Sequence, residues 1–217
     1  MINMIKVLLV DDHDLVRTGI RRLLDDAKGI DVVFEASTGE AAVQYCRNHS
    51  PDIVLMDVNM PGIGGLEATK KIIRFSPDIK VIILTVHVED PFPTKVMQIG
   101  ASGFLTKSTP PQEMIQAIKA VKSGQRYITP GIAQQMALNQ FNKPDESPFA
   151  CLSERELQIM MMITRGEKVV DISTQLSLSS KTINSYRYRM FDKLSVCNDV
   201  ELTHLAIRYG LLNTEML

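Results

Sequence analysis

Five side chains with complementary chemistry follow apolar runs in the first half of the sequence: Asp11, Asp12, Asp57, Thr85 and Lys107. Carboxylates that lie close together raise one another's pKa unless a cation neutralises them, and Mg²⁺ is a cation that prefers oxygen ligands. A carboxylate supported in this way can attack phosphorus to form an acyl phosphate. We therefore expect a magnesium site in which Asp57 is the nucleophile, with Lys107 and Thr85 placed to bind the phosphate that it receives.

The elements that must bring these side chains together are short apolar strands that alternate with helices. The sequence predicts strands at Lys6–Val10, Val32–Ala36, Ile53–Met56, Val81–Thr85 and Gly103–Leu105, and helices at Leu15–Ala27, Gly39–His49, Leu66–Ser76, Pro93–Gly100 and Pro111–Ser123. Near-continuous apolar strands are typical of a parallel sheet that is buried on both faces. Five strand–helix units in residues 5–122 predict an α/β, flavodoxin-like (βα)5 fold, in which ligands bind outside the carboxyl ends of the strands.

The length of 217 residues leaves room for one large or two small domains, and the composition is that of an ordinary soluble globular protein. A net charge of −1 gives the whole chain no general attraction to nucleic acid. No apolar run approaches the roughly 18 to 20 residues of a membrane helix, so no membrane partner is expected. Three widely separated cysteines, Cys46, Cys151 and Cys197, predict a reduced, cytoplasmic protein without a disulfide framework.

A polar segment with two prolines, Gln140–Pro148, ends the alternation of strands and helices, and we assign residues 123–148 to a linker. Beyond the linker, residues 149–213 show only helical patterns and predict a small all-α domain. Ser153 and Glu156 form a predicted capping box at the start of the first helix of this domain.

Two helices expected at Val169–Leu176 and Ser180–Leu194 are joined by so short a turn that they predict a helix-turn-helix. On the longer helix, a buried stripe is expected from Ile183, Tyr186, Met190 and Leu194. Residues 179–194 hold four basic side chains and one acid, whereas residues 149–217 hold eight of each sign. This concentration suits a helix that enters the major groove of DNA, but an ordinary amphipathic helix with a solvated basic face explains the periodicity equally well.

The first domain resembles the receiver domain of two-component response regulators in the segments Val7–His13 and Asp57–Gly62 and at Thr85 and Lys107. The resemblance implies that Asp57 accepts a phosphoryl group from a sensor histidine kinase or from the phosphotransfer domain of a hybrid kinase. It also implies a Mg²⁺ site made by the side chains of Asp11, Asp12 and Asp57 and by the carbonyl group of Asn59. Thr85 would be the switch hydroxyl, and Phe104 occupies a second switch position at which receivers often carry tyrosine.

The second domain resembles the LuxR-type helix-turn-helix in Leu152–Glu156, Ser179–Ile183 and Lys193–Leu194. In that family the long helix lies in the major groove, which implies base contacts by Asn184, Ser185 and Tyr188. The resemblance implies phosphate contacts by Lys181, Thr182, Arg189 and Lys193. Arg187 lies near the edge of the buried stripe, so we expect it to contact phosphate or to pack along its stem.

Together the two domains resemble the NarL/FixJ class of response regulators, and the segment Asn184–Phe191 resembles the GacA/UvrY/SirA branch. The class implies a transcriptional regulator without enzymatic turnover, which binds promoter DNA as a homodimer when phosphorylated. The branch implies control of small regulatory RNA genes. Phosphorylation is expected to draw Thr85 and the loop after the fourth strand toward the phosphate, and so to shift a two-state equilibrium.

Two other interpretations stay open. The segment Asp12–Val16 also matches the start of haloacid-dehalogenase-type phosphatases, in which Asp12 would be the nucleophile. That interpretation leaves Asp57 and the whole second domain without a role. Alternatively, the helical domain could bind a protein in place of DNA, which a salt-dependent, sequence-selective gel shift would exclude.

Overall fold

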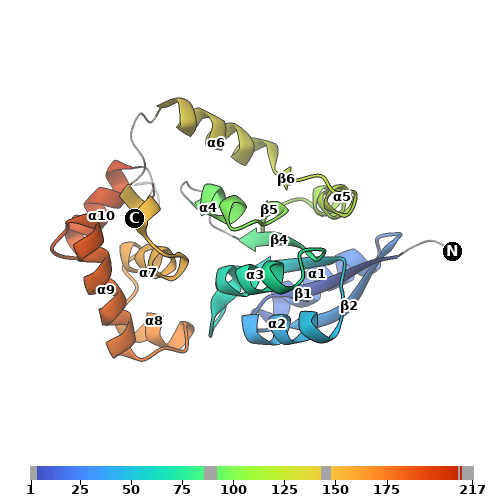
Figure 1. The fold of residues 1–217 in the computed structure, drawn as a ribbon, viewed down its shortest axis with the longest axis horizontal. Helices are drawn as coiled ribbons and strands as arrows, with labels where there is room; N and C mark the ends of the chain where they lie inside the picture. Colours follow the sequence, from blue (N-terminus) through green and yellow to red (C-terminus); the bar gives the residue numbers. More distant parts are fainter. Residues whose placement is uncertain (1–3, 86–91, 143–147, 210, 212–217) are drawn as a thin grey trace. The chain divides into compact units, whose positions relative to one another are not determined.

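The computed structural model describes residues 4–85, 92–142, 148–209 and 211, and it contains an α/β unit and a helical unit (Figure 1). The main boundary between these two compact units lies between Ala133 and Gln134. Among the described residues, no helix is both long enough and apolar enough to cross a membrane. The predicted strand-end residues belong to the first unit, and the predicted helix-turn-helix belongs to the second.

The first unit contains one parallel sheet. Its strands are β1 (Ile5–Val10), β2 (Ile30–Ala36), β3 (Ile53–Asp57), β4 (Lys80–Thr85), β5 (Gly103–Thr106) and β6 (Tyr127–Ile128). They lie in the order β2-β1-β3-β4-β5-β6, so the chain reverses its direction across the sheet at the β1–β3 pair. Val10 pairs with Met56 there, and Asp11 and Asp57 follow directly along the two strands. Such a switch point is where ligands bind in open α/β sheets.

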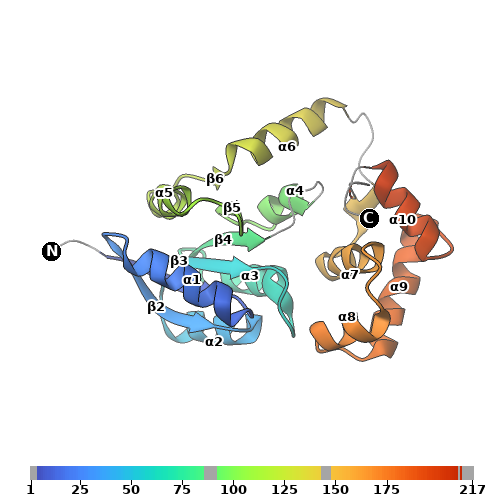
Figure 2. The ribbon, with the colours of Figure 1, turned by 180° about the vertical axis from the view of Figure 1, so that it is seen from behind.

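Helices cover both faces of this sheet. They are α1 (Asp14–Asp25), α2 (Gly39–Asn48), α3 (Gly64–Phe75) and α5 (Pro111–Lys122), while α4 (Phe92–Gln98) lies between β4 and β5 in the sequence. Helices α2 and α3 lie in front of the sheet in Figure 1, whereas α1 lies in front of it in Figure 2. On the α1 side, Leu9 and Leu55 of the strands share a core with Leu24 of α1 and Ile118 of α5. Coverage of both faces explains why the strands are apolar along their length.

The structure confirms the predicted flavodoxin-like units, with limits that differ by a few residues, and it adds two elements within the expected linker. β6 joins the sheet beside β5, where Tyr127 pairs with Gly103. Helix α6 (Pro130–Asn142) begins with a proline, whose fixed φ suits the first position of a helix. Residues 143–147 of the expected linker and residues 86–91 of the loop after β4 lie outside the described residues.

The second unit is built from short helices. They are the 3-10 helix Pro148–Cys151, α7 (Glu154–Thr164), α8 (Val169–Gln175), α9 (Ser180–Leu194) and α10 (Asp199–Arg208). Helix α7 begins with the predicted capping box, in which Ser153 and Glu156 satisfy each other's backbone N–H groups. A short turn joins α8 to α9; Ser177 in this turn has a φ of 51°, and the Ser179 hydroxyl caps α9. The predicted helix-turn-helix is confirmed.

Candidate functional site

Two buried carboxylates share one lysine at the carboxyl end of the sheet. Lys107 Nζ lies 2.7 Å from Asp11 Oδ2 and 2.9 Å from Asp57 Oδ2, and it donates a hydrogen bond to Asp57. The side chains of Asp11 and Asp57 are 0% and 1% exposed, whereas that of Lys107 is 17% exposed. Removing two carboxylates from water is costly, and one ammonium between them offsets part of that cost. A further cation would therefore stabilise the pair.

The electrostatics of Asp57 suit a nucleophile. Burial raises the pKa of Asp57 to about 6, although the Lys107 ammonium acts in the opposite direction. Burial alone would lower the pKa of Lys107, but the charges of Asp57 and Asp11 raise it above its ordinary value. The N–H groups of Val58 and Asn59 donate to Asp57 Oδ1 over 2.7 and 3.4 Å and fix the direction of the carboxylate. At neutral pH Asp57 is thus ionised, oriented and poorly hydrated.

Asp12 and His13 extend the carboxylate pair into a cluster with the donors of a metal site. Asp11, Asp12, His13 and Asp57 each offer one ligand atom, and these atoms lie within 4.8 Å of one another. In the part of the chain that the structure describes, Asp11 Oδ2 and Asp12 Oδ1 are buried oxygens without a hydrogen bond, although Lys107 and His13 lie at ion-pair distance from them. Such oxygens fit a hard divalent cation. The sequence predicts the three aspartates as ligands, but not His13.

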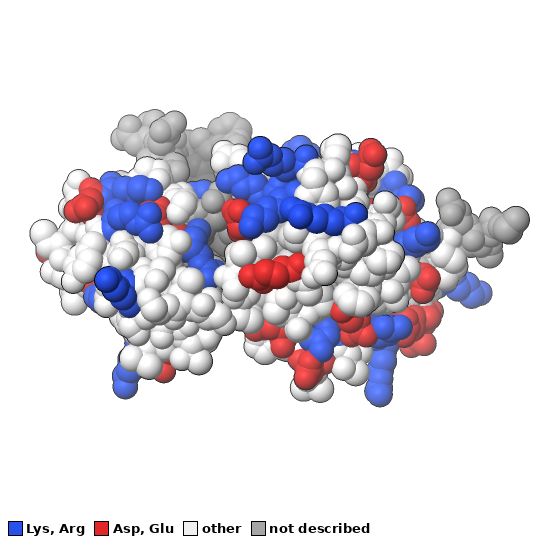
Figure 3. Space-filling model, turned by 60° about the horizontal axis from the view of Figure 1, so that its bottom comes forward, with Lys and Arg blue, Asp and Glu red and all other residues white. Residues whose placement is uncertain are grey.

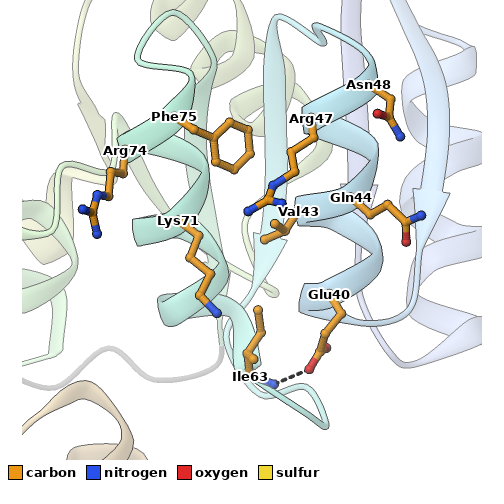
Figure 4. A pocket seen from close by; sticks show the side chains of 9 residues that line it. All are labelled: Glu40, Val43, Gln44, Arg47, Asn48, Ile63, Lys71, Arg74 and Phe75. Carbon is orange, nitrogen blue, oxygen red and sulfur yellow. Dashed lines mark hydrogen bonds between the residues drawn. The ribbon is translucent and has the colours of Figure 1, made fainter.

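Close packing fixes the loop that follows Asp57. A Cβ atom at Gly65 would lie 1.8 Å from the Asp57 carbonyl oxygen, so no side chain fits at that position. The Gly65 N–H donates to the Val58 carbonyl oxygen over 3.0 Å. Glu40 on α2 accepts a hydrogen bond of 2.9 Å from the Ile63 N–H, as Figure 4 shows. The loop is therefore tied both to the strand that carries Asp57 and to a neighbouring helix.

The remaining predicted residues of this site lie on β4, on β5 and in the loop after β3. Thr85 ends β4 and is fully buried, and its carbonyl oxygen accepts a hydrogen bond of 2.9 Å from the Lys107 N–H. Phe104 lies in β5, pairs with Ile83 and is also fully buried. Asn59, two residues after Asp57, is half-buried. The structure brings Thr85 beside Lys107 through the backbone, and the roles of these residues toward phosphate stay predictions.

Helix α9 turns an apolar face toward the core of the second unit. Three of the four predicted core residues are buried: Ile183, Met190 and Leu194. Tyr186 is only half-buried, with the Arg189 guanidinium 4.5 Å from its ring centre, and Phe191 is buried in its place. The prediction for Tyr186 is wrong because the buried stripe of α9 consists of positions 183, 190, 191 and 194, and position 186 lies at its rim.

The outward face of α9 carries most of the predicted DNA contacts. The exposed residues among them are Lys181, Ser185, Tyr188, Arg189 and Lys193. The side chain of Tyr188 is 65% exposed, which is unusual for a large aromatic residue without a partner molecule. Thr182 and Asn184 are half-buried, and Thr182 Oγ1 lies 2.8 Å from the capping hydroxyl of Ser179.

Arg187 and Lys193 are both engaged within the helical unit. The Arg187 guanidinium contacts both carboxylate oxygens of Asp199 on α10, at 2.5 and 3.1 Å, and donates to Asn184 over 2.9 Å. These contacts engage the guanidinium group, so they test neither stem packing nor phosphate contact, the two roles expected for Arg187. Lys193 Nζ lies 2.6 Å from Glu156 Oε2 and joins α9 to the capping box of α7. For Arg187 and Lys193, as for the other predicted residues of α9, contact with DNA stays a prediction.

Two family descriptions match the chain. "Response regulator receiver domain" matches residues 7–119, and "Bacterial regulatory proteins, luxR family" matches residues 150–206. Response regulator UvrY of Escherichia coli (strain K12) is 66% identical over 215 residues, which cover 99% of this chain and 99% of UvrY. The chain belongs to the response regulators. Response regulator GacA of Pseudomonas aeruginosa is 58% identical to this response regulator over 211 residues, which cover 97% of the chain and 99% of GacA.

Solved structures of other response regulators show the same architecture. RcsB from Salmonella enterica serovar Typhimurium, solved bound to a promoter in the presence of phosphomimetic BeF3⁻, aligns with a TM-score of 0.67 and 25% identity. That alignment covers 94% of this chain and 98% of RcsB. A LuxR-family response regulator from Aurantimonas sp. SI85-9A1 aligns with a TM-score of 0.61 and 41% identity, and covers 64% of this chain and 99% of that one. This response regulator therefore combines a receiver fold with a LuxR-type DNA-binding domain.

The receiver also has a cavity, which the cluster carboxylates Asp11, Asp12 and Asp57 do not line. It is a cavity of 910 Å³ between α2 and α3, lined by Glu40, Val43, Gln44, Arg47, Asn48, Ile63, Lys71, Arg74 and Phe75 (Figure 4). None of the predicted site residues lines it. Figure 3 shows a group of Lys and Arg side chains on one part of this face, whereas the Asp and Glu side chains lie scattered among other Lys and Arg side chains.

Proposed function

We propose that this response regulator accepts a phosphoryl group on Asp57 from a sensor histidine kinase or from the phosphotransfer domain of a hybrid kinase. The observation that carries the proposal is the position of Asp57, buried at the sheet's switch point, hydrogen-bonded to Lys107 and within 4.8 Å of the other cluster donors. Asp12 makes no such contact with Lys107 in the described residues, which favours Asp57 over Asp12 as the nucleophile.

The transfer would be an exchange of one bond for another. A carboxylate oxygen of Asp57 bonds to phosphorus while the phosphorus–nitrogen bond of the donor's phosphohistidine breaks, and the imidazole leaves. Lys107 already contacts this carboxylate, so its ammonium group is placed to pair with the negative charge of the transferred phosphoryl group. The Thr85 hydroxyl would then donate to a phosphate oxygen, while the buried Phe104 ring next to Ile83 would register the shift of β4. The protein has no turnover of its own in this scheme.

The cofactor of the proposed site is Mg²⁺. Asp11, Asp12 and Asp57 would hold it together with the Asn59 carbonyl group, and the buried oxygens without hydrogen bonds support this ligand set. When bound, the ion would supply positive charge to the carboxylates and to the oxygens of the arriving phosphoryl group.

The proposed output is regulated binding of promoter DNA by a homodimer in the cytoplasm. RcsB was solved bound to a promoter in the presence of a phosphomimetic, which supports a coupling between the receiver domain and DNA binding in this architecture. We assign the receiver to residues 5–122, the linker to 123–148 and the DNA-binding domain to 149–213, with α9 as the recognition helix. Similarity to UvrY and GacA supports promoters of small regulatory RNA genes as targets.

The decisive experiment compares the wild type with Asp57→Asn in the presence of acetyl phosphate and Mg²⁺. Intact-mass spectrometry should show one added phosphoryl group on the wild type only. Affinity for DNA selected in vitro from random sequence, and the dimer fraction, should rise with it. Asp78→Asn serves as the control, because Asp78 is an exposed acid of the same domain. A mass shift or an affinity response that survives in Asp57→Asn contradicts the proposal.

A further inference from the structure

We propose that His13 is a nitrogen ligand of the carboxylate cluster and raises the affinity of this metal site for ions that accept imidazole, beside the Mg²⁺ that the aspartates hold. The inference rests on the proposed metal site and adds a ligand and a metal preference to it. His13 directly follows Asp12 in the sequence, and its ring belongs to the same cluster of donors as the three aspartates.

The distances around His13 are those of ligands around a common ion. Its Nδ1 atom lies 2.9 Å from Asp12 Oδ1 and 3.4 Å from Asp11 Oδ1. An octahedral ion with bonds of about 2.1 Å holds neighbouring ligand atoms about 3 Å apart and opposite ones about 4.2 Å apart. The four ligand atoms of the cluster lie within 4.8 Å of one another, so they need to move only slightly closer together to bind one ion.

The contact between His13 and Asp12 lacks the geometry of a hydrogen bond. Within the described residues, Asp12 Oδ1 is a buried oxygen with no hydrogen-bond partner, although the imidazole nitrogen is only 2.9 Å away. A protonated imidazole that served simply as a counter-ion would point its N–H at this oxygen. Two electron-pair donors that bind a shared cation also lie close together without a hydrogen bond between them.

The backbone leaves the ring of His13 free for this role. His13 is the N-cap residue of α1, and its side chain makes no capping hydrogen bond. Its N–H group donates to Asp11 Oδ1 over 2.9 Å, which fixes the residue beside the carboxylates. The side chain is 64% exposed, so the ring can turn onto an ion without disturbing the core.

One imidazole changes which ions the site prefers. Mg²⁺ strongly prefers oxygen and retains water, whereas Co²⁺, Ni²⁺ and Zn²⁺ bind imidazole well. The charge of Lys107 beside Asp11 and Asp57 weakens the binding of every divalent ion in the same direction. The difference between Mg²⁺ and Co²⁺ affinity therefore reports on His13 and not on the shared electrostatics.

The test measures Co²⁺ and Mg²⁺ affinity of the full-length protein by calorimetry, with visible absorption to follow the Co²⁺ site. His13→Ala should weaken Co²⁺ binding about tenfold or more, by analogy with the loss of a supporting group at a metal site, and should change Mg²⁺ binding less than about twofold. His13→Asn, which offers oxygen in place of nitrogen, should behave like His13→Ala. His204→Asn is the matched control, because His204 is an exposed histidine on α10. Asp12→Asn gives the baseline for Co²⁺ taken up by the exposed thiols of Cys151 and Cys197.

Each other result overturns a stated part of the scheme. If His13→Ala keeps wild-type Co²⁺ affinity while Asp12→Asn loses both ions, His13 is not a ligand and the aspartate site stands. If His13→Ala weakens Co²⁺ and Mg²⁺ equally, His13 acts on the carboxylates and not as a nitrogen donor. If the wild type binds neither ion, the proposed metal site itself is wrong.

Discussion

The carboxylate cluster and helix α9 use charge in opposite ways. In the receiver, Asp11 and Asp57 are buried, and Lys107 is held within 2.9 Å of both. On α9, Lys181 and Arg189 are exposed at the surface. Buried charges carry a large desolvation cost, so each must have its partner in place before function begins. Exposed charges cost little in folding and contribute only when a charged partner displaces their counter-ions.

Because of this contrast, we expect substitutions at the carboxylate cluster and substitutions on α9 to have different effects. Changes at the carboxylate cluster should alter both stability and signalling, because the same contacts serve both. Changes on the outward face of α9 should alter DNA binding and leave stability nearly unchanged. The following substitutions test where that division holds, in order of decreasing effect.

The largest effect is expected from Gly65→Ala. The added methyl group would lie 1.8 Å from the Asp57 carbonyl oxygen, which is backbone and cannot move aside cheaply. We expect a loss of about 3 kcal/mol or more in the free energy of unfolding, together with a loss of phosphorylation. Gly19→Ala is the control, because a methyl group in α1 meets nothing within 4 Å and should stabilise the receiver by about 0.5–1 kcal/mol. Equal stability of the two variants would contradict the close contact.

Asp57→Asn should stabilise the protein while it abolishes phosphorylation. Because the folded pKa of Asp57 is about 6 and its ordinary value is 3.8, folding favours the protonated acid. The wild type therefore loses stability as the pH rises from about 4 through about 6, and the neutral amide avoids this loss. Urea unfolding without Mg²⁺ should show a gain of about 1–3 kcal/mol at pH 8 and a smaller gain at pH 5. A gain that does not change between these pH values would refute burial as its cause.

Substitutions on the outward face of α9 should separate affinity from specificity. Lys181→Ala and Arg189→Ala should weaken binding to all DNA sequences and reduce the salt dependence by about one phosphate contact each. Tyr188→Ala should cost about 1–2 kcal/mol of binding free energy on preferred sites and much less on others. Fluorescence anisotropy over a salt series measures both quantities, and thermal unfolding should change little. A clear fall in stability would place these residues in the domain core and not at the interface.

The smallest effect on stability is expected at the ion pair between Arg187 and Asp199, whose side chains are both partly exposed. Asp199→Asn removes the partly exposed partner of its guanidinium and should cost about 0.5–1 kcal/mol of stability. If the freed Arg187 then reaches a phosphate, DNA affinity should rise by about twofold. Stability and affinity measured on the same variant decide between the two roles predicted for this residue. Unchanged affinity would assign Arg187 to the internal structure alone.

Much of the receiver could be predicted because buried parallel strands are continuous apolar runs with polar residues at their ends. That pattern places Asp11, Asp57 and Lys107 at one edge of the sheet. It does not contain the side-chain geometry, so the sharing of Lys107 between two acids and the approach of His13 come only from the structure.

The elements that were missed have weaker or conflicting signals. β6 has two residues, too few for any periodicity. Helix α6 does have signals, a proline at its first position and several good helix formers, but the polar segment Gln140–Pro148 nearby indicated a linker instead. On α9, Tyr186 was predicted to be buried, but Phe191 is buried instead. An ideal helical wheel does not show which side of the helix its neighbours leave open.

The position of Lys107 along the chain also has a consequence for synthesis. Lys107 contacts Asp57 across 50 positions, so both acids leave the ribosome well before their counter-ion. A nascent chain that ended after β4 would have to bury Asp11 and Asp57 side by side without an ammonium, at a cost on the order of several kcal/mol. Early closure of the core is thereby disfavoured until β5 and Lys107 emerge. We therefore expect the acids of the proposed phosphorylation site also to delay the folding of an unfinished chain.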